Sequence, residues 1–129
     1  MKVLIVDDSG EVRERIKILL AEVEMVEMIG EAENVQQAIE QIRQQGPDVI
    51  ILDIRMPGGN GIDVLRAIEK KDRSPVIIML TNYPYHQYER KCIDAGADFF
   101  FDKSREFEKV IEVLNGSMAG TDSNLRTFS

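Results

Sequence analysis

The segment that decides the fold is residues 48–53, which read "DVIILD". Its centre is continuously apolar, and an aspartate bounds it on each side. A short run that is apolar at every position indicates a strand covered on both faces, which is typical of a parallel sheet between two layers of helices. The segment therefore predicts an α/β protein in which Asp53 stands at the carboxyl end of a buried strand.

Further short apolar runs predict four more strands. Most of them are continuous runs like the first, whereas "VEMIGEAE" alternates and could lie at an edge of the sheet. The expected strands cover residues 2–7, 26–33, 75–80 and 97–102. Residues 54–61 are rich in Gly, Pro and Asn, and we expect them to form a loop.

Amphipathic segments with apolar residues at helical spacing separate these strands. Either Ser9 or Asp8 can cap the first helix, and Asn34 is the expected cap of the second. We expect the third helix to extend to about Lys71. Ser104 is the expected cap of the fifth helix.

Strand and helix alternate five times along the chain. This alternation predicts a doubly wound α/β fold, (βα)5, with a five-stranded parallel sheet and right-handed crossovers. A single domain over residues 1–114 holds all of these elements. Residues 115–129 have the composition of a flexible C-terminal tail.

Composition and charge argue against several classes of protein. The net charge of −7 disfavours nonspecific DNA binding, and no apolar stretch is long enough to span a membrane. We expect no signal peptide, because the first apolar run is too short. Cys92 is the single cysteine, so no internal disulfide can form. These features predict a cytoplasmic protein that binds neither nucleic acid nor membranes directly.

Polar residues follow four of the expected strands at the point where each strand ends. They are Asp7 and Asp8 after the first strand, Asp53 after the third, Thr81 after the fourth and Lys103 after the fifth. Because ligands of open parallel sheets bind beyond the carboxyl ends of the strands, we expect these side chains to converge. Adjacent aspartates also repel one another unless a positive charge lies between them.

The chemistry of this set indicates a metal ion and a phosphoryl group. Three carboxylates without histidine or cysteine suit Mg²⁺ or Mn²⁺ better than zinc. Lys103 offers a positive charge for a phosphate oxygen, and Thr81 offers a hydroxyl donor. The combination predicts phosphoryl transfer onto a carboxylate oxygen. Each residue alone is more often structural, so the joint pattern carries the prediction.

Four short motifs are specific in combination, although each is common alone. They are "VDD" (6–8), "LDIRMPGGNG" (52–61), "LT" (80–81) and "DK" (102–103). With them, the sequence resembles the receiver domain of bacterial response regulators over about residues 2–114. The resemblance implies a flavodoxin-like sheet with strand order 2-1-3-4-5.

The resemblance also implies roles for the acidic residues. Asp53 would be the phosphoacceptor, and Mg²⁺ would be held by Asp7, Asp8, Asp53 and the backbone carbonyl of Arg55. A protein of this kind catalyses its own Mg²⁺-dependent phosphorylation and dephosphorylation but acts primarily in signalling. Its phosphodonor would be a histidine kinase or a histidine phosphotransferase.

The resemblance places the remaining residues in binding and switching. Thr81 and Lys103 would bind the phosphoryl oxygens, and Phe100 falls on the family's switch-aromatic position. The fourth helix, fifth strand and fifth helix would form the surface that contacts a downstream protein. Ile18 lies off the apolar face of the first helix, and we expect it to belong to the surface where the phosphodonor docks.

One departure from the family concerns the residue after Lys103. Many relatives have a proline with a cis peptide bond there, whereas this chain has Ser104. A cis bond before a residue other than proline costs about 3 kcal/mol, so we expect a trans bond.

Other readings of the sequence stay open at this point. A receiver fold could serve as a constitutive interaction module, and the chain could be the receiver half of a truncated transcription regulator. Phosphohistidine chemistry at His86 and a redox role for Cys92 are weaker alternatives. A solvated His86 and a core Cys92 are the plainer interpretations.

Overall fold

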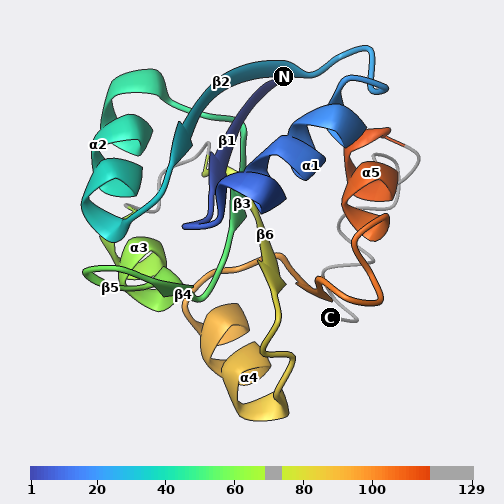
Figure 1. Cartoon of the computed structure of the whole chain (residues 1–129). Coiled ribbons are helices and arrows are strands. Elements are labelled where there is room, and N and C mark those ends of the chain that lie inside the picture. The colour runs from blue at the N-terminus through green and yellow to red at the C-terminus, as the bar shows by residue number, and fades with distance from the viewer. Residues whose placement is uncertain (69–73, 117–129) are drawn as a thin grey trace.

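The computed structural model describes residues 1–68 and 74–116, which form a layered α/β domain (Figure 1). Five parallel strands make up the sheet, in the order β2-β1-β3-β6-β7. The strands are β1 (Lys2–Val6), β2 (Glu27–Ala32), β3 (Val49–Leu52), β6 (Val76–Thr81) and β7 (Phe99–Asp102). When only these strands are counted along the chain, their order is the predicted 2-1-3-4-5, and the predicted fold class is confirmed.

Helices cover both faces of the sheet, as the apolar strands require. On one face, α1 (Gly10–Leu20) and α5 (Lys109–Leu114) pack on the side chains that include Ile5 and Ile51. The other face is covered by α2 (Val35–Gln45), α3 (Gly61–Ala67) and α4 (His86–Asp94). Successive residues of β3 point into opposite cores, and all four of its side chains are buried.

Two of the predicted helix caps are present. The Ser9 hydroxyl accepts a hydrogen bond from the amide of Val12 at 3.3 Å, so Ser9, not Asp8, caps α1. The Asn34 side chain likewise accepts from the amide of Gln37 at 2.8 Å and caps α2. Asp8 is therefore left free of any capping role.

Residues 54–61 contain more structure than a plain loop. A small antiparallel hairpin of β4 (Arg55–Met56) and β5 (Gly59–Asn60) forms there. Its turn is formed by Pro57 and Gly58, and the φ angles of Gly58 and Gly59, 83° and 145°, suit glycine. The two-residue strands carry no periodic pattern, which is why the sequence predicted only a loop.

Two predicted helix boundaries were wrong. The third helix ends at Ala67, and the extended backbone of Ile68 means that it does not continue unbroken toward the predicted end near Lys71, which itself lies outside the described residues. The sequence after Ile68 is a charged run with no apolar residue to pack a further turn against the core. Ser104 does not cap α5, which begins at Lys109. Instead, Asp102 accepts the Ser104 amide on its carboxylate at 2.9 Å and holds a turn between the strand and the helix.

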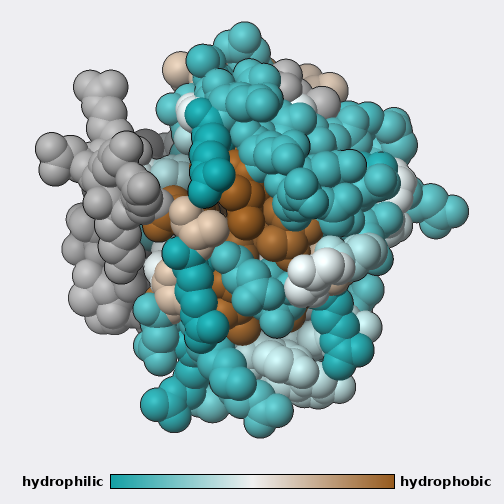
Figure 2. Space-filling view, turned by 90° about the vertical axis from the view of Figure 1, so that its left-hand side faces the viewer, coloured by the Kyte–Doolittle hydropathy of each residue, from teal (hydrophilic) through white to brown (hydrophobic). Residues whose placement is uncertain are grey.

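A surface hollow lies between α2 and the β4–β5 turn. It has a volume of about 560 Å³ and is lined by residues that include Val35, Ile39 and Pro57. Figure 2 views the left-hand side of Figure 1, where α2 and α3 lie, and shows apolar surface in a hollow that hydrophilic side chains border. None of the polar residues predicted to form the site lines it.

Two further predictions concern the C-terminal tail and membrane-spanning segments. From residue 117 onward, the predicted tail (115–129) lies outside the described residues. Within the described part of the chain, no helix is both long and apolar enough to cross a bilayer.

Candidate functional site

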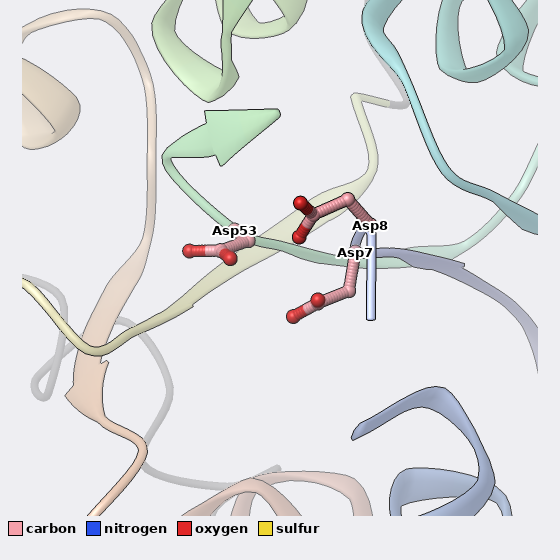
Figure 3. Close-up of side chains that lie close together, drawn as sticks. All are labelled: Asp7, Asp8 and Asp53. Carbon is pink, nitrogen blue, oxygen red and sulfur yellow. The ribbon is translucent and has the colours of Figure 1, made fainter. Parts of the chain in front are cut away.

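Three aspartates meet at the carboxyl edge of the sheet. Asp7 and Asp8 follow β1, and Asp53 follows the neighbouring strand β3, so strand pairing brings them together. Each offers a carboxylate oxygen, and these oxygens lie within 4.8 Å of one another. Figure 3 shows the three side chains gathered around the ends of the two strands. Asp7 is 2% exposed and Asp53 is 6% exposed, whereas Asp8 is open to solvent.

Lys103 supplies the positive charge that the acidic cluster needs. Its Nζ lies 2.6 Å from Oδ2 of Asp7 and 2.9 Å from Oδ2 of Asp53. The ammonium group therefore bridges the two buried carboxylates and offsets their mutual repulsion. With 8% of its surface exposed, Lys103 is itself buried.

Backbone amides fix the orientation of the two buried carboxylates. Oδ1 of Asp7 accepts the amide of Ser9 at 2.9 Å, and Oδ1 of Asp53 accepts the amide of Ile54 at 2.7 Å. Each carboxylate thus binds one amide and the ammonium group of Lys103. Among the described residues, Asp8 makes no hydrogen bond or ion pair, so its carboxylate is the one free to bind a ligand.

The electrostatics of the site favour an added cation. Burial raises the pKa of Asp53 above its ordinary value, and the negative charge of Asp7 raises it further. Lys103 lowers this pKa, but it offsets the increase only in part. Burial acts to lower the pKa of Lys103, but hydrogen bonds and attraction to the two carboxylates raise it overall. Lys103 is therefore charged at neutral pH. The Asp53 carboxylate, in contrast, lacks full compensation.

Thr81 ends β6 at the same edge of the sheet. It is fully buried, and its Oγ1 accepts the amide of Tyr83 at 3.0 Å. The carbonyl of Thr81 accepts the backbone amide of Lys103 at 2.8 Å, which joins the ends of β6 and β7. The fold thus brings together the five polar residues predicted from the strand ends.

Phe100 lies on β7, next to the strand that carries Thr81. In the register of these strands Phe100 pairs with Met79, two residues before Thr81, on the face covered by α4. The ring is partly exposed and packs against the core on that face. Phe100, the predicted switch aromatic, therefore lies close to the end of β6, where Thr81 stands.

Arg55 lies in β4, directly after the acidic cluster. Its guanidinium carbon sits 4.2 Å from the ring centre of Tyr83, and a hydrogen bond with Tyr88 acts to raise its pKa. The side chain therefore links the loop after β3 to the segment after β6. The metal-binding role of its backbone carbonyl stays a prediction.

Several groups that shape the site are not among the residues predicted from the sequence. Backbone amides such as that of Ile54 have no residue signature. Gly61 stands in the sequence only as the last residue of the motif at 52–61, yet a Cβ at this position would clash with the carbonyl oxygen of Asp53. Asn60 and Asp63 form a capping box that starts α3 immediately after this contact. Arg13 contacts the acidic turn from α1, and its position in the helix did not single it out.

The residues considered for other roles lie apart from the cluster. Ile18 is 68% exposed on α1, as its position off the apolar face predicted. His86 is exposed at the start of α4, consistent with a solvated side chain. Cys92 is buried in the core, and burial raises the pKa of its thiol to about 11, which keeps it in the unreactive thiol form at neutral pH. The described residues contain no cis peptide bond, so the predicted trans bond between Lys103 and Ser104 is confirmed.

The residues present fit a hard divalent cation. The donor set is composed of carboxylate oxygens, one of them unpaired and open to solvent, and it lacks histidine and cysteine. Mg²⁺ prefers such oxygen ligands and typically keeps several waters. Fold and site together define a doubly wound α/β protein with a cluster of three aspartates and a buried lysine at the carboxyl edge of its sheet.

Comparison with known proteins places the chain in a family. The model of the response regulator receiver domain matches residues 3–115. The chemotaxis protein CheY of Bacillus subtilis is 34% identical over 117 residues, which cover 91% of this chain and 97% of CheY. The chain belongs to the response regulator receiver domain family.

Two further relatives show the range of proteins that contain this domain. The sensory transduction protein LytT of Bacillus cereus is 32% identical over 98% of this chain, which spans 51% of the length of LytT. A structure of a CheX–CheY–BeF3–Mg²⁺ complex from Borrelia burgdorferi matches with a TM-score of 0.75 and 27% identity, over 88% of each chain.

Proposed function

We propose that this protein is a phosphorylation-dependent signalling switch that accepts a phosphoryl group on Asp53. The donor would be a histidine kinase or a histidine phosphotransferase. The observation that carries the proposal is the meeting of Asp53 with Asp7 and Lys103, whose Nζ lies within 3 Å of both carboxylates. Two buried acids that share one ammonium group suit a site that gains a cation and a phosphoryl group.

In the proposed reaction, a carboxylate oxygen of Asp53 attacks the phosphorus of the donor. An O–P bond forms to give an acyl phosphate, and the bond from phosphorus to the leaving group breaks, with the electron pair going to the leaving group. With acetyl phosphate as donor, the leaving group is acetate. Lys103 exchanges its bond to Asp53 for one to a phosphoryl oxygen, and the Thr81 hydroxyl donates to another.

A bound Mg²⁺ would neutralise charge on the phosphoryl oxygens. Asp7, Asp8, Asp53 and the carbonyl of Arg55 would hold it. Support comes from the Borrelia CheY, which was solved in a complex that contains Mg²⁺ and BeF3. The same complex contains a second protein, CheX, which is consistent with output through protein contacts.

The output surface in this proposal is formed by α4, β7 and α5. Phe100 lies on β7 beside the strand that ends in Thr81, so a movement of Thr81 toward the phosphoryl group would open space for the ring to turn inward. The downstream target would be a protein, and we place the switch in the cytoplasm. We propose no direct contact with nucleic acid or membranes.

The proposal is tested with acetyl phosphate and Mg²⁺. We expect a labelled protein whose modification depends on both reagents and maps to Asp53. A chain that stays unlabelled under conditions that label a known receiver would instead support a constitutive interaction module.

Replacing Thr81 separates phosphorylation from switching. Thr81→Ala should still be labelled by acetyl phosphate, because the attacking oxygen belongs to Asp53, but its conformational response should be lost. A switch that is driven from mostly inactive to mostly active needs roughly 5 kcal/mol of coupling, and the hydroxyl is part of that link. The readout is the change in the Phe100 ring resonances on phosphorylation. Thr81→Ser keeps the hydroxyl and should respond like the wild type, and an equal response in Thr81→Ala would contradict the role.

Ile18 is proposed to belong to the phosphodonor interface. Ile18→Asp should slow phosphotransfer from the histidine kinase that labels the wild type fastest, by about tenfold, because it places a charge in an apolar contact. Labelling by acetyl phosphate should stay unchanged, since that donor needs no docking surface. Met25→Asp is the matched control, because Met25 is 74% exposed, close to the 68% of Ile18, but lies outside α1. Equal rates of phosphotransfer from the kinase to both variants and to the wild type would show that Ile18 does not belong to the interface.

A further inference from the structure

The peptide that joins the two acids of the cluster is anchored by a side chain from α1. Nη1 of Arg13 donates to the backbone carbonyl of Asp7 at 2.6 Å. That carbonyl belongs to the peptide plane between Asp7 and Asp8, so rotation of the plane would move the Asp8 carboxylate. The carboxylate of Asp7 is held separately, by the amide of Ser9 and by Lys103. Asp8 makes no such bond in the described chain, so the contact with Arg13 is the nearest restraint on its direction.

Arg13 is itself held in place by the neighbouring strand. Its Nε donates to Oε1 of Glu31 at 2.9 Å, while Lys17 Nζ binds the other oxygen of Glu31 at 2.9 Å. The side chain of Arg13 is only 17% exposed. Glu31 lies on β2, whose next residue, Ala32, accepts the backbone amide of Asp7 at 3.0 Å. Both backbone groups of Asp7 are therefore tied to an arrangement of α1 and β2.

The pairing with Glu31 also reduces the net positive charge that Arg13 would otherwise place beside the aspartates. An isolated guanidinium group close to three carboxylates would compete with a divalent cation for them. Glu31 pairs with Arg13 and with Lys17, and Lys17 also pairs with Glu14, so two carboxylates balance the two positive charges. Hydrogen bonds from Lys17 and Arg13 lower the pKa of Glu31, so it stays ionised at neutral pH. Arg13 can thus restrain the acidic turn while adding little net charge beside it.

We propose that Arg13, held by Glu31, is a positioning residue that sets the affinity of the acidic cluster for Mg²⁺. This inference rests on the proposed function, because it needs Asp7 and Asp8 to bind the cation. Arg13 acts through the peptide between them and touches neither the metal nor the phosphoryl group. Groups that orient metal ligands in this way commonly change metal affinity 10- to 100-fold when they are removed.

Positioning and simple charge predict opposite results for Arg13→Gln. Removal of a positive charge near the cluster would strengthen cation binding if charge alone mattered. If Arg13 orients Asp8, the same substitution should weaken binding by about tenfold. Arg13→Lys keeps the charge but cannot form the two-pronged contact with both Asp7 and Glu31, so it should also weaken binding.

The experiment measures the binding of Mn²⁺, as a paramagnetic substitute for Mg²⁺, by the electron paramagnetic resonance signal of the free ion. Arg15→Gln is the matched control, because it removes the same charge from the same helix, where Arg15 lies over the ring of Phe107. We expect weaker binding in both Arg13 variants and binding within about twofold of the wild type in Arg15→Gln. Circular dichroism at the temperature of the assay checks that each variant is folded.

The outcomes separate this inference from the proposed function. Wild-type binding with unchanged or tighter binding in the Arg13 variants overturns the positioning role and leaves the metal site intact. A wild type that binds no Mn²⁺ overturns both. If neither Arg13 variant folds, Arg13 is a structural residue and the inference is wrong. As a second readout, saturating Mn²⁺ should restore the rate of labelling by acetyl phosphate in the folded variants.

Discussion

Asp53→Asn is expected to take up no measurable phosphoryl group from acetyl phosphate and Mg²⁺, a loss of more than about a hundredfold. The amide lacks the nucleophilic carboxylate oxygen, although its carbonyl oxygen can still accept the amide of Ile54. The fold should be retained, and the melting temperature should be equal or higher, because burial disfavours the charge that the substitution removes. Intact-protein mass spectrometry measures the uptake.

Asp94→Asn is the control for this experiment. Asp94 is an exposed acid near the end of α4 and has the same chemistry as Asp53 without its surroundings. It should be labelled like the wild type. Labelling of Asp53→Asn at the wild-type rate would mean that another residue accepts the phosphoryl group.

Lys103→Met should have the largest effect on stability. The substitution leaves Asp7 and Asp53 buried and facing one another without the ammonium group that now lies 2.6 Å and 2.9 Å from them. Breaking a buried ion pair in this way typically costs 3–5 kcal/mol, and we expect the free energy of unfolding at pH 7.5 to fall by about 3 kcal/mol. Urea denaturation measures the change.

The pH dependence of Lys103→Met follows from the same charges. Burial already raises the pKa of Asp53, and loss of Lys103 should raise it further. A carboxyl group whose pKa is higher in the folded state than in the unfolded state gains stability as the pH falls through the folded value. The deficit of the variant relative to the wild type should therefore shrink between pH 7.5 and pH 5, and Mg²⁺ should reduce it at neutral pH.

Lys109→Met serves as the control for the loss of a lysine. Lys109 pairs with Glu106 at 2.7 Å, but its side chain is about half exposed. Exposed pairs of this kind contribute between 0 and about 1 kcal/mol, so this variant should melt close to the wild type at every pH. Equal stability of the two lysine variants would contradict the bridging role of Lys103.

The sequence was sufficient for the sheet and for the residues that meet at its edge. Continuous apolar strands such as β3 can only be buried from both sides, and the alternation with helices leaves few arrangements of a parallel sheet. In that arrangement, the residues after β1, β3, β6 and β7 come to one edge. Asp7, Asp53, Thr81 and Lys103 could thus be grouped without knowledge of any distance.

The parts that could not be predicted depend on local geometry and not on residue pattern. Ser104 is a good capping residue, but the carboxylate of Asp102 accepts its amide, and the carbonyl of Asp102 accepts the amide of Glu106. These bonds form a turn after β7, and α5 therefore begins only at Lys109. The bridging position of Lys103 between Asp7 and Asp53 needs side-chain distances that no sequence pattern supplies. The contact of Arg13 with the carbonyl of Asp7 is hidden for the same reason, because its partner is a backbone atom.

The most direct test of the account identifies the residue that carries the phosphoryl group. The wild-type protein is incubated with acetyl phosphate and Mg²⁺, treated with borohydride, digested and sequenced by mass spectrometry. Borohydride reduces an acyl phosphate to an alcohol, so a phosphorylated aspartate becomes homoserine. The account predicts homoserine at position 53 and at no other aspartate. Homoserine elsewhere, or a protein that remains unmodified while a known receiver is labelled in parallel, would contradict it.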